Sequence, residues 1–112
     1  MLARPRTVDV YATAGTIPTF PFNEWMRDLK DLIGKAAIDS RIALLRRGSL
    51  GKKYKDIGEG LIELKVDSGP GYRVYIADDG RNSLILCAGS KGTQKRDIKV
   101  AKAYWQDYKA RG

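Results

Sequence analysis

The chain contains no histidine and only one cysteine in 112 residues, and these two absences exclude several kinds of chemistry. Without histidine, Ser-His-Asp and Cys-His nucleophilic sites are impossible. A single cysteine cannot form a disulfide within the chain, and one thiol without histidine does not supply the ligands of a zinc site. Cys87 lies in the apolar run 84–88, which predicts a buried core thiol. We therefore expect no metal and no cofactor.

Long hydrophobic runs are also missing. No apolar stretch approaches the roughly 20 residues that span a bilayer, and the first residues lack the apolar segment of a secretory signal. No G-x-x-x-x-G-K-[ST] phosphate loop is present, and Gly58-Glu59-Gly60 is too weak a pattern for a dinucleotide site. The sequence predicts a cytoplasmic protein without membrane contact, formed by one domain over residues 1–112.

Positive charge, by contrast, is abundant. The chain carries 21 Lys+Arg against 13 Asp+Glu, a net charge of +8 and a pI near 9.7. Residues 41–55 hold six cations and no acid, and residues 91–112 hold seven cations against two acids. Such excess on a small domain indicates a polyanionic partner, nucleic acid or an acidic protein, although a merely soluble basic surface is the simpler alternative.

Periodicity and turn residues predict an α+β fold, in which an N-terminal strand and a helical hairpin pack on a small antiparallel sheet followed by a C-terminal helix. Pro21 begins the first predicted helix and Gly34 ends it. The expected helices cover residues 21–33, 35–46 and 95–109, the last beginning at Lys95 or Asp97. The expected strands cover residues 7–11, 53–57, 61–67, 72–77 and 84–88.

The turn at residues 67–71 places unusual partners opposite each other. In an antiparallel hairpin around it, Lys65 faces Arg73 and Glu63 faces Tyr75, all on one side of the sheet. Like charges directly opposite destabilise a sheet by a few tenths to about 1 kcal/mol. The pairing of two cations there therefore indicates an anion between them.

Lysine, arginine, tyrosine and one glutamate can together cleave RNA without a metal, because cations stabilise the pentacoordinate phosphorane and the leaving oxygen. Lys91, which follows the last predicted strand, could reach the same face. Structural alternatives remain for each residue. Lys65 could be a solvated strand cation, Arg73 could form a diagonal salt bridge with Glu63, and Tyr75 could be a half-buried ring.

Two runs carry a family resemblance when taken together: residues 69–75, GPGYRVY, and residues 89–98, GSKGTQKRDI. With Pro21-Phe22-Asn23-Glu24-Trp25 and Gly60-Leu61-Ile62-Glu63-Leu64, they resemble RelE/HigB-type toxins of bacterial type II toxin–antitoxin modules, in the phage Gp49-like, addiction-module killer branch of the RelE/ParE superfamily. Lys65 stands where that branch usually has arginine, so it keeps the charge but lacks the bidentate fork.

This resemblance implies a RelE-like fold and a metal-independent endoribonuclease that cuts mRNA on the ribosome and arrests growth by inhibiting translation. It implies as partner a cognate antitoxin, a small helix-turn-helix protein encoded next to it. Lys65 and Arg73 would contact the scissile phosphate, and Lys91 would add charge or a proton. Glu63 would act as general base or orient Arg73, and Tyr75 would stack on or position a base. The implied RNA-binding residues are Arg46, Arg47, Lys52, Lys53, Lys55, Lys95 and Arg96.

Two alternatives from other classes stay open. A ParE-like toxin that inhibits DNA gyrase would keep the fold but need no phosphate site. A non-catalytic basic module would bind nucleic acid in a salt-dependent way and cause no growth arrest.

Overall fold

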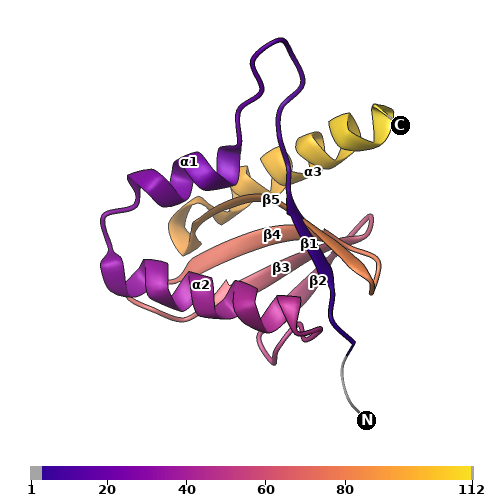
Figure 1. Cartoon of the computed structure of the whole chain (residues 1–112). Coiled ribbons are helices and arrows are strands. Elements are labelled where there is room, and N and C mark those ends of the chain that lie inside the picture. Colours follow the sequence, from indigo (N-terminus) through magenta and orange to yellow (C-terminus); the bar gives the residue numbers. More distant parts are fainter. Residues whose placement is uncertain (1–3, 112) are drawn as a thin grey trace.

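A single five-stranded sheet forms the centre of the protein, in the order β1-β5-β4-β3-β2 (Figure 1). The computed structural model describes residues 4–111. The strands are β1 (Thr7–Val10), β2 (Tyr54–Gly58), β3 (Leu61–Val66), β4 (Tyr72–Asp78) and β5 (Asn82–Ser90). The helices are α1 (Pro21–Asp28), α2 (Leu32–Arg46), the short 3₁₀ turn η1 (Lys91–Thr93) and α3 (Gln94–Ala110). The predicted α+β class is confirmed.

The predicted hairpin register is also confirmed. β3 and β4 pair antiparallel, with Lys65 opposite Arg73 and Glu63 opposite Tyr75. The turn is tight because Gly71 donates from its backbone N–H to the Ser68 carbonyl, 2.9 Å away. Two-residue periodicity and a glycine-rich turn are local signals, so the sequence could predict this pairing.

The sheet is covered on both faces (Figure 1). Helices α1 and α2 pack over one face, where Leu64, Val74 and Ile76 belong to the larger core. Helix α3 packs over the other face, where Tyr75, Leu86 and Ala101 belong to a second core. The catalytic roles expected of Glu63 and Tyr75 require an open sheet face, and this expectation is wrong, because the apolar stripe of α3 covers that face and both residues are buried.

The boundary between the first two helices also differs from the prediction. The first helix ends at Asp28, and Gly34 lies inside α2 rather than before it. Asp31 caps α2, because its carboxylate accepts a hydrogen bond of 2.9 Å from the Gly34 backbone N–H. A Cβ on Gly34 would lie 2.6 Å from both Asp31 Oδ2 and a carbon of the Tyr72 ring, so this glycine serves close packing.

β1 joins the sheet parallel to β5, with Val8 opposite Ser83, an arrangement that local signals did not predict. The remaining pairs are antiparallel, so the sheet is mixed. Over residues 4–111, no helix is long and apolar enough to cross a membrane.

Candidate functional site

Arg73 and Lys91 meet at one end of the sheet, where the β3–β4 turn forms a cavity of about 340 Å³. The cavity is lined by residues 67–71 of the turn together with these two side chains. Two of the five predicted catalytic residues therefore border one opening. Lys65 lies next to Arg73 on the same face and is half-exposed.

The position of Lys91 follows from backbone contacts. Its backbone N–H donates to the Gly71 carbonyl at 2.9 Å, which fastens the end of β5 to the turn. Gly71 has a φ of +85°, and a Cβ there would lie 3.5 Å from the Cβ of Lys91. A side chain at position 71 would therefore be strained by the backbone conformation, although its Cβ would make only an ordinary contact with Lys91.

A second clamp holds the turn against α2. The Tyr72 hydroxyl donates a hydrogen bond of 2.6 Å to Asp31 Oδ2. This bond, together with the backbone N–H of Gly34, lowers the pKa of Asp31 below its usual range. Because Tyr72 is the first residue of β4, the clamp fixes the strand end that carries Arg73.

Arg73 and Glu63 form a buried ion pair that lacks good hydrogen bonds. Arg73 Nε lies 3.9 Å from Glu63 Oε1, and the side chains are 9% and 0% exposed. Gln94, in the first turn of α3, donates from Nε2 to Glu63 Oε2 at 2.7 Å. Yet, among residues 4–111, Glu63 Oε1, Arg73 Nε and the Tyr75 hydroxyl are buried without a partner at good hydrogen-bond geometry. Three such atoms in one place are uncommon in a folded protein and mark a site that demands explanation.

Tyr75 is fully buried beneath α3. Its burial and the neighbouring Glu63 carboxylate raise the pKa of Tyr75, so the phenol stays protonated. A base cannot stack on this ring in the present conformation. Glu63 is likewise sealed from solvent, which leaves it in a position to orient Arg73 but out of reach of a substrate hydroxyl.

The basic residues predicted to bind RNA are all exposed but divide into two groups. Lys53 lies beside the site, because its carbonyl accepts from the Lys65 backbone N–H and its ammonium pairs with Asp67. Arg46 lies at the opposite end of the sheet, where its carbonyl accepts from the Arg6 backbone N–H. Lys52 and Lys55 flank Lys53 and Tyr54, Arg47 follows Arg46, and Lys95 and Arg96 lie in the first turn of α3.

Gln94 and Asp97 support the site, although their place in the sequence predicted no role for them. Asp97 is buried and accepts a hydrogen bond from the Thr93 hydroxyl, which ties η1 to α3. A Cβ on Gly89 would lie 1.8 Å from Asp97 Oδ2, so glycine is needed beneath this carboxylate. Gln94 and Asp97 both lie in the run 89–98 that carries the family resemblance. Only the fold shows that they hold α3 over Glu63.

Metal ligands do not gather at the site. Among residues 4–111, no group of three or more Asp, Glu, Cys or His side chains is placed to hold a metal ion. Asp78 and Asp79 lie where β4 turns into β5, and both make structural bonds there. Asp78 pairs with Arg6, and Asp79 accepts backbone hydrogen bonds from Arg81 and Asn82.

The fold and site define a small basic α+β protein with a cationic cavity at one sheet end. Residues 24–106 match the family described as "Phage derived protein Gp49-like (DUF891)", and the chain belongs to this family. A relative from Haemophilus influenzae, described as "Uncharacterized protein", is 42% identical over 90 residues, which cover 80% of this chain and 90% of that protein. No solved structure matches the chain.

Proposed function

We propose that the protein is a RelE/HigB-type toxin that cleaves mRNA without a metal and is neutralised by a cognate antitoxin. The observation that carries the proposal is the meeting of Arg73 and Lys91 at the cavity of the β3–β4 turn, with Lys65 beside them. The sequence resemblance of this Gp49-like chain to such toxins supplies the substrate class, and the positive charge of the surface supports it.

The three cations would stabilise the extra negative charge of the phosphorane, which is the largest contribution such a site can make. The 2′-oxygen would attack phosphorus, and the bond to the 5′-oxygen would break, leaving a 2′,3′-cyclic phosphate and a 5′-hydroxyl. Lys91 is exposed at the cavity mouth and would give the 5′-oxygen its proton, while water takes the 2′-hydroxyl proton. Glu63 would hold Arg73 in place.

The exposed cations around this end would bind the RNA backbone, and salt would weaken that binding steeply because phosphate contacts release counterions. Lys52, Lys53, Lys55, Lys95 and Arg96 fit this role by position. Arg46 and Arg47 lie at the far end of the sheet and would contact RNA only on a large partner such as the ribosome.

Mapping of mRNA 5′ ends after tightly controlled expression tests the proposal. Wild-type protein should arrest growth and produce new 5′ ends within coding regions. The double variant Lys65→Ala/Lys91→Ala should lose both effects, because it removes two cations while sparing the buried Arg73. Lys99→Ala, an exposed lysine of α3 away from the cavity, is the matched control and should behave as wild type.

One observation favours a second candidate. Glu63 and Tyr75 are sealed beneath α3, as expected for a toxin of the ParE type that inhibits DNA gyrase and needs no phosphate site. Growth arrest with intact transcripts, undiminished in the double variant, would establish this alternative and reject RNA cleavage. RNA binding without growth arrest would instead indicate a non-catalytic nucleic-acid-binding module.

A further inference from the structure

A second cavity, of about 490 Å³, lies at the opposite end of the sheet from Arg73. Its volume is within the range of about 300–1,000 Å³ typical of ligand pockets. Asp78 at its edge is five residues along β4 from Arg73, or about 17 Å at roughly 3.3 Å per residue. A ligand can therefore occupy this cavity without touching the cationic site.

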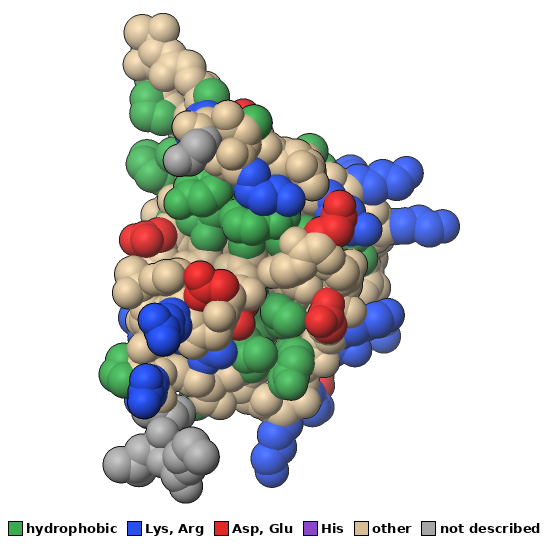
Figure 2. All heavy atoms as spheres, turned by 90° about the vertical axis from the view of Figure 1, so that its right-hand side faces the viewer, with side chains coloured by type: hydrophobic (Ala, Val, Ile, Leu, Met, Phe, Trp, Pro, Cys, Tyr) green, Lys and Arg blue, Asp and Glu red, His purple; other side chains and the backbone are tan. Residues whose placement is uncertain are grey.

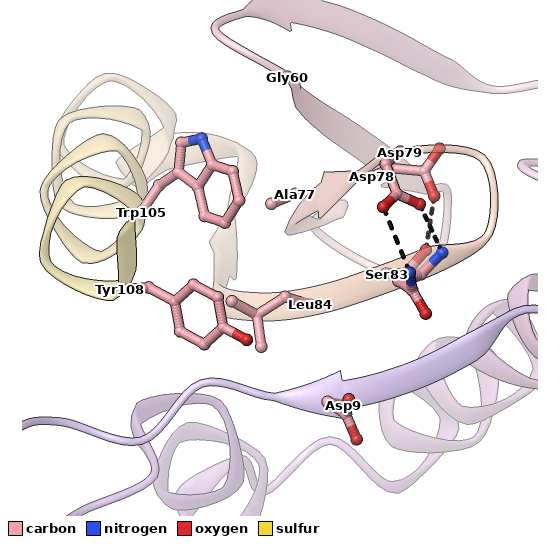
Figure 3. A pocket seen from close by; sticks show the side chains of 10 residues that line it. Asp9, Gly60, Ala77, Asp78, Asp79, Ser83, Leu84, Trp105 and Tyr108 are labelled. Carbon is pink, nitrogen blue, oxygen red and sulfur yellow. Dashed lines mark hydrogen bonds between the residues drawn. The ribbon is translucent and has the colours of Figure 1, made fainter. Parts of the chain in front are cut away.

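Two aromatic rings from α3 form one wall of the cavity (Figure 3). Trp105 and Tyr108 stack with ring centroids 5.8 Å apart and an interplanar angle of 15°. The Trp105 indole is held in place, because its Nε1–H donates to the Glu59 carbonyl at 3.0 Å. Lys109 Nζ lies 5.3 Å from the centroid of the same ring, which shows that the indole face already attracts a cation.

Acidic side chains form the opposite wall, with Asp78 and Asp79 across from the rings and Asp9 of β1 along one border (Figure 3). Arg6 neutralises Asp78 at 2.9 Å, but the Asp9 carboxylate has neither hydrogen bond nor ion pair within residues 4–111. Within the part of the chain that the structure describes, no lysine or arginine lines the cavity, although the chain carries a net charge of +8.

Acidic side chains gather around this cavity. In Figure 2 they border the hydrophobic patches, one Lys or Arg side chain lies against the upper patch, and most Lys and Arg lie along the right-hand and lower edges and at the lower left. Phosphate groups would be repelled by the aspartates, so RNA does not fit the cavity. Aromatic faces and carboxylates together attract organic cations. Because a guanidinium is planar, it can stack on an aromatic ring while donating two hydrogen bonds to a carboxylate.

We propose that this cavity binds an arginine side chain of a partner protein, stacked against Trp105 and Tyr108 and paired with Asp9. The proposal rests on this cavity alone and does not depend on RNA cleavage. The chain carries a net charge of +8, yet this cavity is lined by three aspartates, so its lining is complementary to a cationic side chain of a partner.

The two tryptophans provide the measurement. In ¹H–¹⁵N spectra of the full chain, the Trp105 indole signal should shift saturably on titration with Ac-Gly-Arg-Gly-NH₂, whereas the signal of Trp25, on α1, should stay constant. The peptide with citrulline in place of arginine has the same shape without the charge and should bind about tenfold more weakly. Asp9→Asn and Tyr108→Ala should each weaken binding of the arginine peptide several-fold. Both residues are exposed, so these changes should leave the fold intact.

Asp39→Asn is the matched control, because Asp39 is an equally exposed aspartate on α2, away from the cavity, and it should bind as wild type. Equal binding of the arginine and citrulline peptides, absence of a Trp105 shift, or equal shifts of both indoles would overturn the proposal. N-Butylguanidine, a free guanidinium compound with the same single charge as the peptide, separates the two possible sources of the ligand. Tighter binding of butylguanidine than of the peptide would indicate a small-molecule site and reject the partner side chain.

Discussion

Two arginine–carboxylate pairs lie at opposite ends of β4, and they differ in how well their polar atoms are satisfied. At the Asp78 end, Arg6 Nε lies 2.9 Å from the carboxylate, which also accepts from the Ser83 hydroxyl at 2.7 Å. At the other end, Arg73 Nε lies 3.9 Å from Glu63. Both pairs are nearly buried, but only the second contains polar atoms without partners.

Under the proposed function, the difference separates a structural pair, Arg6–Asp78, from a functional one, Arg73–Glu63. A buried charge pair is retained at low cost only when further hydrogen bonds satisfy it, as at Asp78. A pair that is left under-satisfied lowers stability, and the proposed function explains its presence by a role in holding Arg73 at the cavity. Arg73 also borders a cavity with Lys91, whereas Arg6 bonds to the Gly48 carbonyl and fastens the N-terminal segment to the end of α2.

Breaking the satisfied pair should have the largest effect. Arg6→Ala leaves Asp78 buried without its cation, and we expect the free energy of unfolding to fall by about 3–5 kcal/mol. Urea denaturation followed by circular dichroism measures this change. Arg4→Ala is the control, since Arg4 is exposed, and should change stability by less than about 0.5 kcal/mol. Equal stability of the two variants would show that the Asp78 pair is not structural.

At the other end, an exposed cation should matter for activity rather than for stability. Lys91→Ala should slow RNA cleavage by about 100-fold, or about 2.7 kcal/mol of transition-state stabilisation, because one charge at the phosphate is lost. Its midpoint of unfolding should stay unchanged. Cleavage rates from 5′-end mapping measure the effect, with Lys99→Ala as control. Normal cleavage by Lys91→Ala would show that Lys91 takes no part in catalysis.

Removing the hydrogen bond between Gln94 of α3 and Glu63 should produce the smallest of the three effects. Burial raises the pKa of the Cys87 thiol to about 12, and its sulfur lies 3.8 Å from the Asp97 carbonyl at the start of α3. Alkylation of this thiol therefore requires local opening. Gln94→Ala removes the hydrogen bond to Glu63 and should speed native-state alkylation at pH 8 by several-fold.

Lys99→Ala again serves as control for the labelling rate. An unchanged rate in Gln94→Ala would mean that the hydrogen bond to Glu63 does not hold α3 closed.

Local signals explain what the sequence could predict. The β3–β4 register follows from alternation and a glycine-rich turn, and Lys65 was correctly placed opposite Arg73. The predicted helix over residues 95–109 nearly coincides with α3 (Gln94–Ala110), because its apolar residues recur at helical spacing. The expectation that Cys87 is buried was also confirmed.

Long-range packing explains what was missed. Gly34 looked like a helix stop, but the Tyr72 ring, 38 positions away, makes it a packing glycine inside α2. Nothing local indicates that α3 covers Glu63, or that Arg6 pairs with Asp78, 72 positions later. The β3–β4 register was therefore predicted correctly, whereas the burial of Glu63, Arg73 and Tyr75 was not.

One paired measurement tests the central claim that the Arg6–Asp78 pair serves stability and the Glu63–Arg73 pair serves RNA cleavage. Glu63→Gln and Asp78→Asn each replace one buried carboxylate by its neutral isostere, and both variants are compared for unfolding free energy and RNA cleavage well below their melting temperatures. The account predicts that Asp78→Asn loses stability but cleaves RNA, whereas Glu63→Gln loses less stability and cleaves RNA much more slowly. Full cleavage by Glu63→Gln, together with equal losses of stability in the two variants, would contradict it.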